Sequence, residues 1–132
     1  MTDQKSHPKS SNKSDDYFWR EDFESFSASQ VERYHKGVTD TPFNEFLYDP
    51  LLLELMEPHL PPEGGTILDA GGGTGKWAVY FAKRGYPVTL LDVAEPMLVK
   101  AREVTVAAGV AEMVTIQSGS ITSLPYGDAS FD

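Results

Sequence analysis

A glycine-rich loop flanked by two acidic residues is the part of the sequence best suited to chemistry. Gly71, Gly73 and Gly75 follow Asp69 closely, and Asp92 ends the next apolar run. Glycines at this spacing let a backbone turn tightly and approach a ligand without a Cβ in the way. The Asp92 carboxylate can accept both hydroxyl protons of a ribose, whereas an acid beside the loop repels a pyrophosphate and attracts a cation. Together these residues indicate a nucleoside that carries an ammonium or sulfonium group.

The spacing of the loop separates this ligand from two others. A phosphate-binding P-loop needs a glycine where Ala70 stands and a serine or threonine where Trp77 stands, so that kind of site is excluded. A dinucleotide fingerprint needs its third glycine at the position of Lys76. This mismatch weakens a nicotinamide site but leaves it open as an alternative.

The elements around the loop alternate between strands and helices. Apolar runs predict strands at 66–70, 87–92 and 113–119, and helical periodicity predicts helices at 75–84 and 95–109. Such alternation is typical of an α/β fold with a parallel sheet and helices on its faces. Ligands of these folds bind at the carboxyl ends of the strands, where the glycine loop and the two acids are expected to meet.

The remaining chain divides into a tail and an arm. Residues 1–16 are polar and are predicted to form a disordered tail. Residues 17–62 are predicted to form an N-terminal helical arm or lid, with a break between two short helices at Asp49-Pro50 because a proline disfavours helix in the residue before it. Residues 63–132 then form the α/β unit.

Three motifs in this order resemble those of the class I S-adenosylmethionine-dependent methyltransferases. "ILDAGGGTGKW" is similar to the first motif of that family, "LLDVAEPMLVKAR" to its second-strand acid and the helix that follows, and "LPYGDASFD" to the stretch before its fourth strand. The resemblance covers about residues 43–132. It implies a Rossmann-like sheet of seven strands with helices on both faces, S-adenosyl-L-methionine as cofactor, and methyl transfer as the reaction.

The resemblance also implies roles for individual residues. Gly71 and Gly73 would line the methionine moiety of the cofactor with Asp69 near its ammonium group, and Asp92 would bind the ribose. Val93 and Met97 would pack against the adenine. Ser120 stands where many relatives have an acid that contacts the adenine amine, and Ile121 follows it. The cofactor-binding residues implied in this way are Asp69, Ala70, Gly71, Gly73, Gly75, Asp92, Val93, Met97, Ser120 and Ile121.

Composition limits the other possibilities. The 132 residues carry a formal net charge of −9, which makes nucleic acid a poor electrostatic partner. The absence of cysteine excludes a disulfide framework and a thiolate metal site. The sequence shows neither the apolar core of a signal peptide nor a run long enough to span a membrane, so a cytoplasmic protein is expected.

Several further side chains are assigned structural roles. The three histidines have no metal-ligand spacing, and His35 is interpreted as a surface residue. It and Tyr34 lie in the segment that, in the resembling family, can fold over the cofactor as a lid, so a functional contact there stays open. On the first turn of the helix after the loop, Lys76 is expected to be an exposed cation and Trp77 a packing aromatic. No metal site is predicted.

The function that the resemblance implies is methyl transfer, and we expect a small-molecule or lipid-like acceptor. No catalytic residue is named, because displacement at a sulfonium needs a base only when the acceptor must lose a proton. The alternatives are a non-catalytic module that binds adenosylmethionine and works through a partner, and a nicotinamide-dependent oxidoreductase. Phe131-Asp132 look like the start of a fourth strand, so we expect either a truncated C-terminal half or completion of the sheet edge by a homodimer.

Overall fold

The computed structural model describes residues 22–132, and it confirms the predicted α/β fold class. The predicted tail at 1–16 and the first five residues of the predicted arm lie outside the described residues. The three predicted strands are all present and form one parallel sheet in the order β1-β2-β3. Their bounds differ from the prediction by one residue at most at either end: β1 (Ile67–Ala70), β2 (Val88–Asp92) and β3 (Val114–Ser118).

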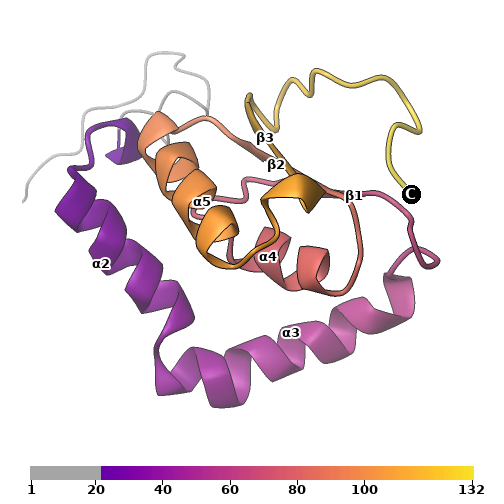
Figure 1. The fold of residues 1–132 in the computed structure, drawn as a ribbon, viewed down its shortest axis with the longest axis horizontal. Helices are drawn as coiled ribbons and strands as arrows, with labels where there is room; N and C mark the ends of the chain where they lie inside the picture. Colours follow the sequence, from indigo (N-terminus) through magenta and orange to yellow (C-terminus); the bar gives the residue numbers. More distant parts are fainter. Residues whose placement is uncertain (1–21) are drawn as a thin grey trace, which may run out of the picture.

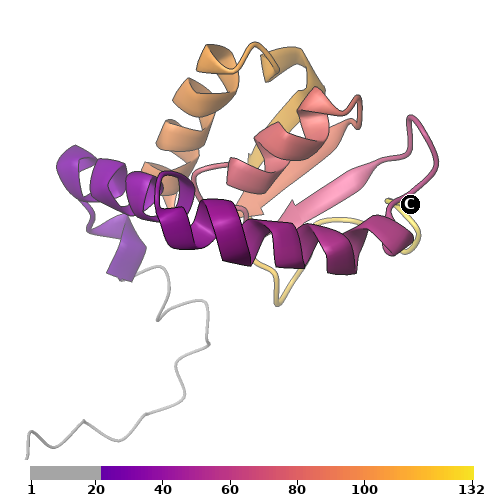
Figure 2. The same ribbon diagram turned by 90° about the horizontal axis from the view of Figure 1, so that it is seen from below.

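Two helices connect the strands and form the core with them. They are α4 (Lys76–Lys83) and α5 (Glu95–Ala107), with a 3-10 turn, η3 (Ala111–Met113), before β3. The fully buried Leu90 of β2 and Leu98 of α5 lie in one apolar cluster with Phe81 of α4. Figures 1 and 2 show both helices on the same face of the sheet. When each new parallel strand is added on the same side of the previous one, right-handed crossovers place all connecting helices on one face of the sheet. The helices predicted for the second face are not among the described elements.

After a short helical piece at 22–24, the described arm continues as two longer helical stretches that meet at an angle (Figure 1). The first is α2 (Ala28–Thr39), which begins with a capping box between Ser27 and Gln30. The second runs without interruption through a π-helical turn, an α-helix and a 3-10 turn, which are η1 (Asn44–Tyr48), α3 (Asp49–Met56) and η2 (Glu57–His59). In Figure 2 the helical stretch that contains α3 crosses in front of the α/β unit.

The predicted helix break at Asp49-Pro50 is therefore wrong. Asp49 has helical dihedral angles, φ −66° and ψ −46°, and Pro50 lies in the first turn of α3. Proline is tolerated in the first turn of a helix, because the backbone N–H that it lacks would have no acceptor within that helix. The π-helical turn before Pro50 also changes the spacing of the backbone hydrogen bonds locally. The chain instead breaks at Asp40, whose backbone N–H closes α2 on the carbonyl of Lys36.

The last residues return to the outer edge of β1. The Asp132 backbone N–H donates to the carbonyl of Thr66 at 3.2 Å, and the Asp132 carboxylate accepts from the Thr66 backbone N–H at 2.9 Å. These bonds lie beside the start of β1, where a further strand was expected, although residues 119–132 themselves form turns and loops. Tyr126 and Phe131 pack edge to face within this segment, with ring centroids 5.0 Å apart.

Candidate ligand-binding site

A cavity of about 460 Å³ opens at the carboxyl ends of the strands, as the sequence predicts. It lies between the glycine loop after β1, the start of α5, the loop after β3 and the N-terminal arm. Its volume falls in the range of pockets that hold a small ligand. The lining residues are Phe23, Tyr34, Gly71, Gly73, Asp92, Val93, Met97, Gly119, Ile121 and Thr122.

The glycine loop has the backbone that its residue types suggest. Gly71, Gly73 and Gly75 have φ values of +75°, +54° and +89°, a region that side chains with a Cβ rarely adopt. A Cβ on Gly71 or Gly73 would meet no atom within 4 Å, so this wall of the cavity is open backbone. The Gly71 N–H donates to the carbonyl of Leu91 at 2.8 Å, which holds the loop over the end of β2.

Gly72 is required for a different reason, which the sequence analysis missed. Its φ is not in the left-handed region, but a Cβ there would lie 2.6 Å from Leu90 Cγ and 2.8 Å from Asp69 Oδ2. Such contacts are too short for any side chain, so Gly72 allows the loop to lie directly on these two residues. The uninterrupted run of three glycines was the signal that could have suggested it.

Asp92 joins three parts of the site. One carboxylate oxygen accepts the N–H of Gly73 at 2.9 Å, and the other accepts the N–H of Ala94 at the start of α5, also at 2.9 Å. Each carboxylate oxygen can accept a further hydrogen bond, so a ligand hydroxyl at the cavity wall can share them. Asp92 thus fixes the glycine loop relative to α5 and also presents acceptors to the cavity.

Asp69 lies behind the loop with an unsatisfied acceptor. Its Oδ2 is buried and has no hydrogen-bond partner. The pKa of Asp69 is raised to about 6: burial is the main cause, a hydrogen bond from the backbone N–H of Ala78 opposes it, and the negative charge of Asp92 adds to it. A buried acceptor without a donor is rare in a folded protein, so this carboxylate suits a cationic or hydrogen-bond-donating group at the loop.

The structure brings six of the ten predicted residues together on the cavity wall: Gly71, Gly73, Asp92, Val93, Met97 and Ile121. Met97 is 2% exposed and also packs against Val31 of α2, so it serves the core as well as the cavity. Ile121 is 58% exposed and lies at the rim.

The other four predicted residues are not on the wall. Asp69 lies behind the loop, Ala70 is exposed at the end of β1, and Gly75 forms the N-terminal cap of α4. The Ser120 hydroxyl accepts the backbone N–H of Thr122 at 2.9 Å and turns into its own loop. Gly119 and Thr122 line the cavity where Ser120 was expected.

The arm contributes two aromatic walls. Phe23 and Tyr34 line the cavity and pack edge to face, with ring centroids 5.6 Å apart. Burial and the nearby Asp92 charge raise the pKa of the Tyr34 hydroxyl. From the sequence, a Tyr34 contact stays open and Phe23 is not expected at the site, because spacing alone does not show how α2 docks on the sheet.

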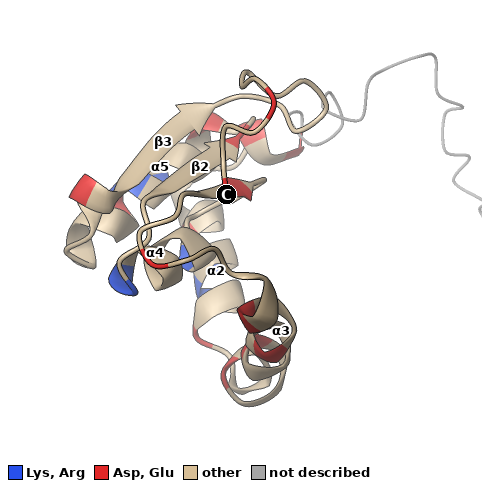
Figure 3. Cartoon of the chain, turned by 90° about the vertical axis from the view of Figure 1, so that its right-hand side faces the viewer, with Lys and Arg blue, Asp and Glu red and all other residues tan. Residues whose placement is uncertain are grey.

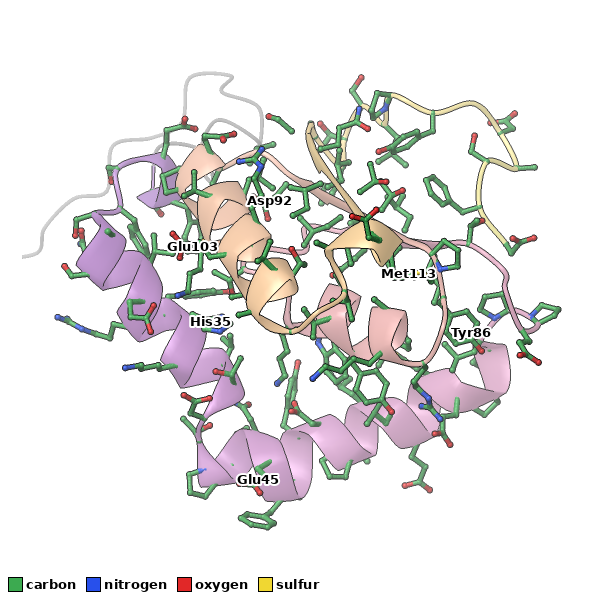
Figure 4. The ribbon with its side chains drawn as sticks, viewed as in Figure 1. His35, Glu45, Tyr86, Asp92, Glu103 and Met113 are labelled. Carbon is green, nitrogen blue, oxygen red and sulfur yellow. The ribbon has the colours of Figure 1, made fainter. Side chains whose placement is uncertain are left out.

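His35 and Lys76, which were predicted to be surface residues, instead form hydrogen bonds between the arm and the α/β unit. His35 points from α2 toward the α/β unit (Figure 4), and its Nδ1 lies 2.8 Å from the hydroxyl of Thr74 in the glycine loop. Lys76 is not an exposed cation: its ammonium group donates to the carbonyl of Val38 at 2.6 Å and to Asp49 at 2.5 Å. His35 on the arm meets a hydroxyl of the glycine loop, and Lys76 meets acceptors on the arm, so only the tertiary fold brings these partners near.

Two features are absent from the part of the chain that the structure describes. No group of three or more histidine, aspartate or glutamate side chains there could hold a metal ion. No helix among residues 22–132 is long and apolar enough to cross a membrane.

A parallel sheet with a glycine loop after β1, an acid at the end of β2 and a cavity above both defines a Rossmann-like α/β domain for a nucleoside ligand. A family model described as "Methyltransferase domain" matches residues 67–132, which is half of the chain. The chain therefore belongs to the methyltransferase domain family, as the three motifs predict. No finding favours the nicotinamide-dependent or the non-catalytic alternative.

Known relatives agree with this assignment. The ubiquinone/menaquinone biosynthesis C-methyltransferase of Roseobacter denitrificans is 39% identical over 80 residues, which cover 59% of this chain and 32% of that protein. The malonyl-[acyl-carrier protein] O-methyltransferase of Erwinia pyrifoliae is 40% identical over 78 residues, covering 59% and 28%. A crystal structure of a SAM dependent methyltransferase from Aquifex aeolicus matches with a TM-score of 0.61 and 26% identity over 81% of this chain and 54% of that one. The chain thus spans about a third of the length of the curated relatives it matches.

Proposed function

We propose that this chain binds S-adenosyl-L-methionine and forms the cofactor-binding half of a methyltransferase that acts on a small-molecule acceptor. The observation that carries the proposal is the placement of the glycine loop and Asp92 on the wall of one cavity, with the unpartnered Asp69 oxygen buried behind the loop. The family assignment supports the same cofactor.

The residues of the site fit the parts of this cofactor. Gly71 and Gly73 leave backbone open to a methionine moiety, and the unpartnered Asp69 oxygen matches its ammonium group. Asp92 has acceptor capacity left for ribose hydroxyls. Val93 and Met97 provide an apolar surface for the adenine ring.

When bound, S-adenosylmethionine supplies a methyl group on a sulfonium that is ready for displacement. The contribution of this chain is to bind, orient and exclude water. Asp92 fixes the glycine loop relative to α5, while Phe23 and Tyr34 cover the cavity from the arm. A base is needed only for an acceptor that loses a proton, and we assign none.

The acceptor that we propose is a small organic molecule in the cytoplasm. The net charge of −9 disfavours a nucleic acid as substrate. Between the two curated relatives described above, one is named for methylation at carbon and the other at oxygen, so family membership leaves the acceptor atom open.

The test is calorimetric titration of the chain with S-adenosylmethionine, S-adenosylhomocysteine and NAD. We expect both adenosyl ligands to bind and NAD to give no heat. Asp92→Ala removes the ribose acceptor but also two structural hydrogen bonds, so Asp92→Asn is the sharper variant, because its amide oxygen can keep one of them. Loss of binding in both variants with unchanged circular dichroism supports the proposal. A folded wild-type chain that binds neither adenosyl ligand contradicts it.

A further inference from the structure

Helix α2 is fastened to the α/β unit along one side. Val31 is buried against Ala94 and Met97 at the start of α5, and Glu32 forms an ion pair with Lys100 further along that helix. Figure 1 shows α2 running beside α5. These contacts place α2 against the sheet's helical layer, but none of them reaches the glycine loop.

One hydrogen bond joins α2 to the loop itself. His35 Nδ1 lies 2.8 Å from Thr74 Oγ1, and Thr74 is only 2% exposed. Thr74 stands between Gly73 and Gly75, which both have positive φ, so it is the one residue of that stretch with a side chain to hold. Among residues 22–132, His35 is the only hydrogen-bond partner of the Thr74 hydroxyl.

The two ends of this bond adjoin groups that face the cavity. Tyr34, next to His35, lines the cavity from α2, and Gly73, next to Thr74, lines it from the loop. The N–H of Gly73 also donates to Asp92. A shift of either end therefore moves a part of the wall on which a ligand rests.

We propose that His35 is a positioning residue that couples the docking of α2 to the ligand-binding conformation of the glycine loop. A buried hydroxyl that loses its only partner is penalised, so the loop and α2 favour each other's docked state. Anything that binds the docked loop then also favours the docked arm, with Tyr34 over the cavity. Only the identity of the ligand rests on the proposed function; the coupling itself is a property of the unliganded chain.

The test uses variants of both ends of the bond. His35→Phe keeps a ring but removes the nitrogen, His35→Asn offers an amide atom near the position of Nδ1, and Thr74→Val removes the hydroxyl at equal size. Arg33→Ala, an exposed change on the same helix, is the control. Two quantities are measured: hydrogen exchange of backbone amides at 71–76 in the unliganded protein, and affinity for S-adenosylhomocysteine.

We expect His35→Phe to speed exchange in the loop and to weaken S-adenosylhomocysteine roughly tenfold, the size of a typical coupling between sites. His35→Asn should recover much of both effects, and His35→Phe combined with Thr74→Val should be no worse than the more damaging single variant. Arg33→Ala should match the wild type.

The inference is overturned if His35→Phe leaves loop exchange unchanged, if His35→Asn is no better than His35→Phe, or if the double variant is additive. Val31→Ala loosens α2 but keeps the bond, so it should speed loop exchange only while His35 is present; an equal increase when Val31→Ala is added to His35→Phe would also overturn the inference. A wild-type chain that binds no S-adenosylhomocysteine defeats the proposed function alone, because the exchange comparison needs no ligand.

Discussion

At the residue scale, several residues of the site serve both the fold and the cavity. Asp92 holds backbone N–H groups of two elements while it faces the cavity, and Met97 belongs to the core and to the cavity wall. Asp69 is the exception, because its Oδ2 accepts no hydrogen bond in the unliganded chain. A substitution that removes this oxygen is therefore expected to change ligand binding without breaking a hydrogen bond of the unliganded chain.

Asp69→Asn is predicted to stabilise the unliganded protein and to weaken the adenosyl ligands. The pKa of Asp69 lies near 6 in the folded chain, above its ordinary value of 3.8, so the ionised carboxylate opposes folding at neutral pH. By linkage, this group favours folding fully below about pH 4, and that contribution is lost as the pH rises through 6. A shift of this size corresponds to about 3 kcal/mol. Thermal unfolding at pH 7.5 and pH 4 measures it.

The gain in Asp69→Asn should be present at pH 7.5 and absent at pH 4, since the wild-type side chain is then largely neutral too. In the wild type, affinity for S-adenosylhomocysteine should fall as the pH drops through about 6. An equal stability change at both pH values, or a pH-independent affinity, would refute the assignment of an uncompensated carboxylate to the site.

Gly72→Ala is predicted to destabilise the fold and Gly37→Ala is not. A Cβ at Gly72 would lie 2.6 Å from Leu90 Cγ, whereas one at Gly37 in α2 would have open space. Overpacking of this kind costs about 1–3 kcal/mol, while glycine to alanine inside a helix gains roughly 0.5–1 kcal/mol. Urea denaturation of both variants checks the contrast. Similar midpoints would mean that the loop does not rest on β2 as described.

At the element scale, the arm is held to the α/β unit by polar side chains as much as by apolar ones. Lys76 bonds the end of α2 through Val38 and the start of α3 through Asp49. Glu32 reaches Lys100 on α5, and His35 reaches the loop. The arm is therefore docked at several points, each from a different turn of its helices.

Lys76→Met is predicted to cost about 2 kcal/mol of unfolding free energy, because it leaves the Asp49 carboxylate and the Val38 carbonyl without their donor. The Lys76 and Asp49 side chains are 18% and 22% exposed, so solvent screens the pair only in part. Arg102→Met, which breaks the pair with Glu95 at 50% and 51% exposure, should cost under about 1 kcal/mol. Equal losses in denaturant titrations would contradict a docking role for Lys76.

The sequence predicted the strands and the helices between them because their signals are local. Apolar runs, the glycines at 85 and 109 and Pro96 mark the ends of α4 and α5 to within two residues. The arm was predicted less well. The π-helical turn before Pro50 and the inward direction of His35 and Lys76 depend on where the arm docks, and no local pattern encodes that.

The candidate site shows the same division. Gly71, Gly73 and Asp92 were predicted because motif spacing places them at strand ends. Gly72 and Gly119 were missed, since their need for glycine arises from Leu90 and Leu91 on another strand. Phe23 reaches the cavity only because α2 packs on α5, a contact between distant segments.

At the scale of the whole molecule, exposed apolar and charged side chains are unevenly distributed over the surface of the described chain. Five large apolar side chains on η1, α3 and the residue before them are more than half exposed: Phe43, Phe46, Leu47, Leu51 and Leu55. The sequence from 37 to 75 contains no lysine or arginine, and Figure 3 shows acidic but no basic residues on α3. An apolar face of this kind promotes association of chains in solution, against the repulsion of its acidic neighbours.

Phe46→Ser with Leu51→Ser is predicted to reduce self-association without weakening ligand binding, because neither residue lines the cavity. Sedimentation velocity at low and high salt should show wild-type association that strengthens with salt, as screening of the acidic residues requires. Val106→Ser, which changes an apolar side chain that is 67% exposed on α5 and lies outside η1 and α3, is the control and should have no effect. A wild-type chain that stays monomeric at all salt concentrations would contradict this expectation.

The most direct test of the central claim is a crystal structure of the chain with S-adenosylhomocysteine. We predict the ribose at Asp92, the amino group beside the glycine loop within reach of Asp69, and the adenine against Val93 and Met97. Helix α2 should remain docked with His35 on Thr74. A ligand bound elsewhere, or in the cavity with its ribose away from Asp92, would contradict the account.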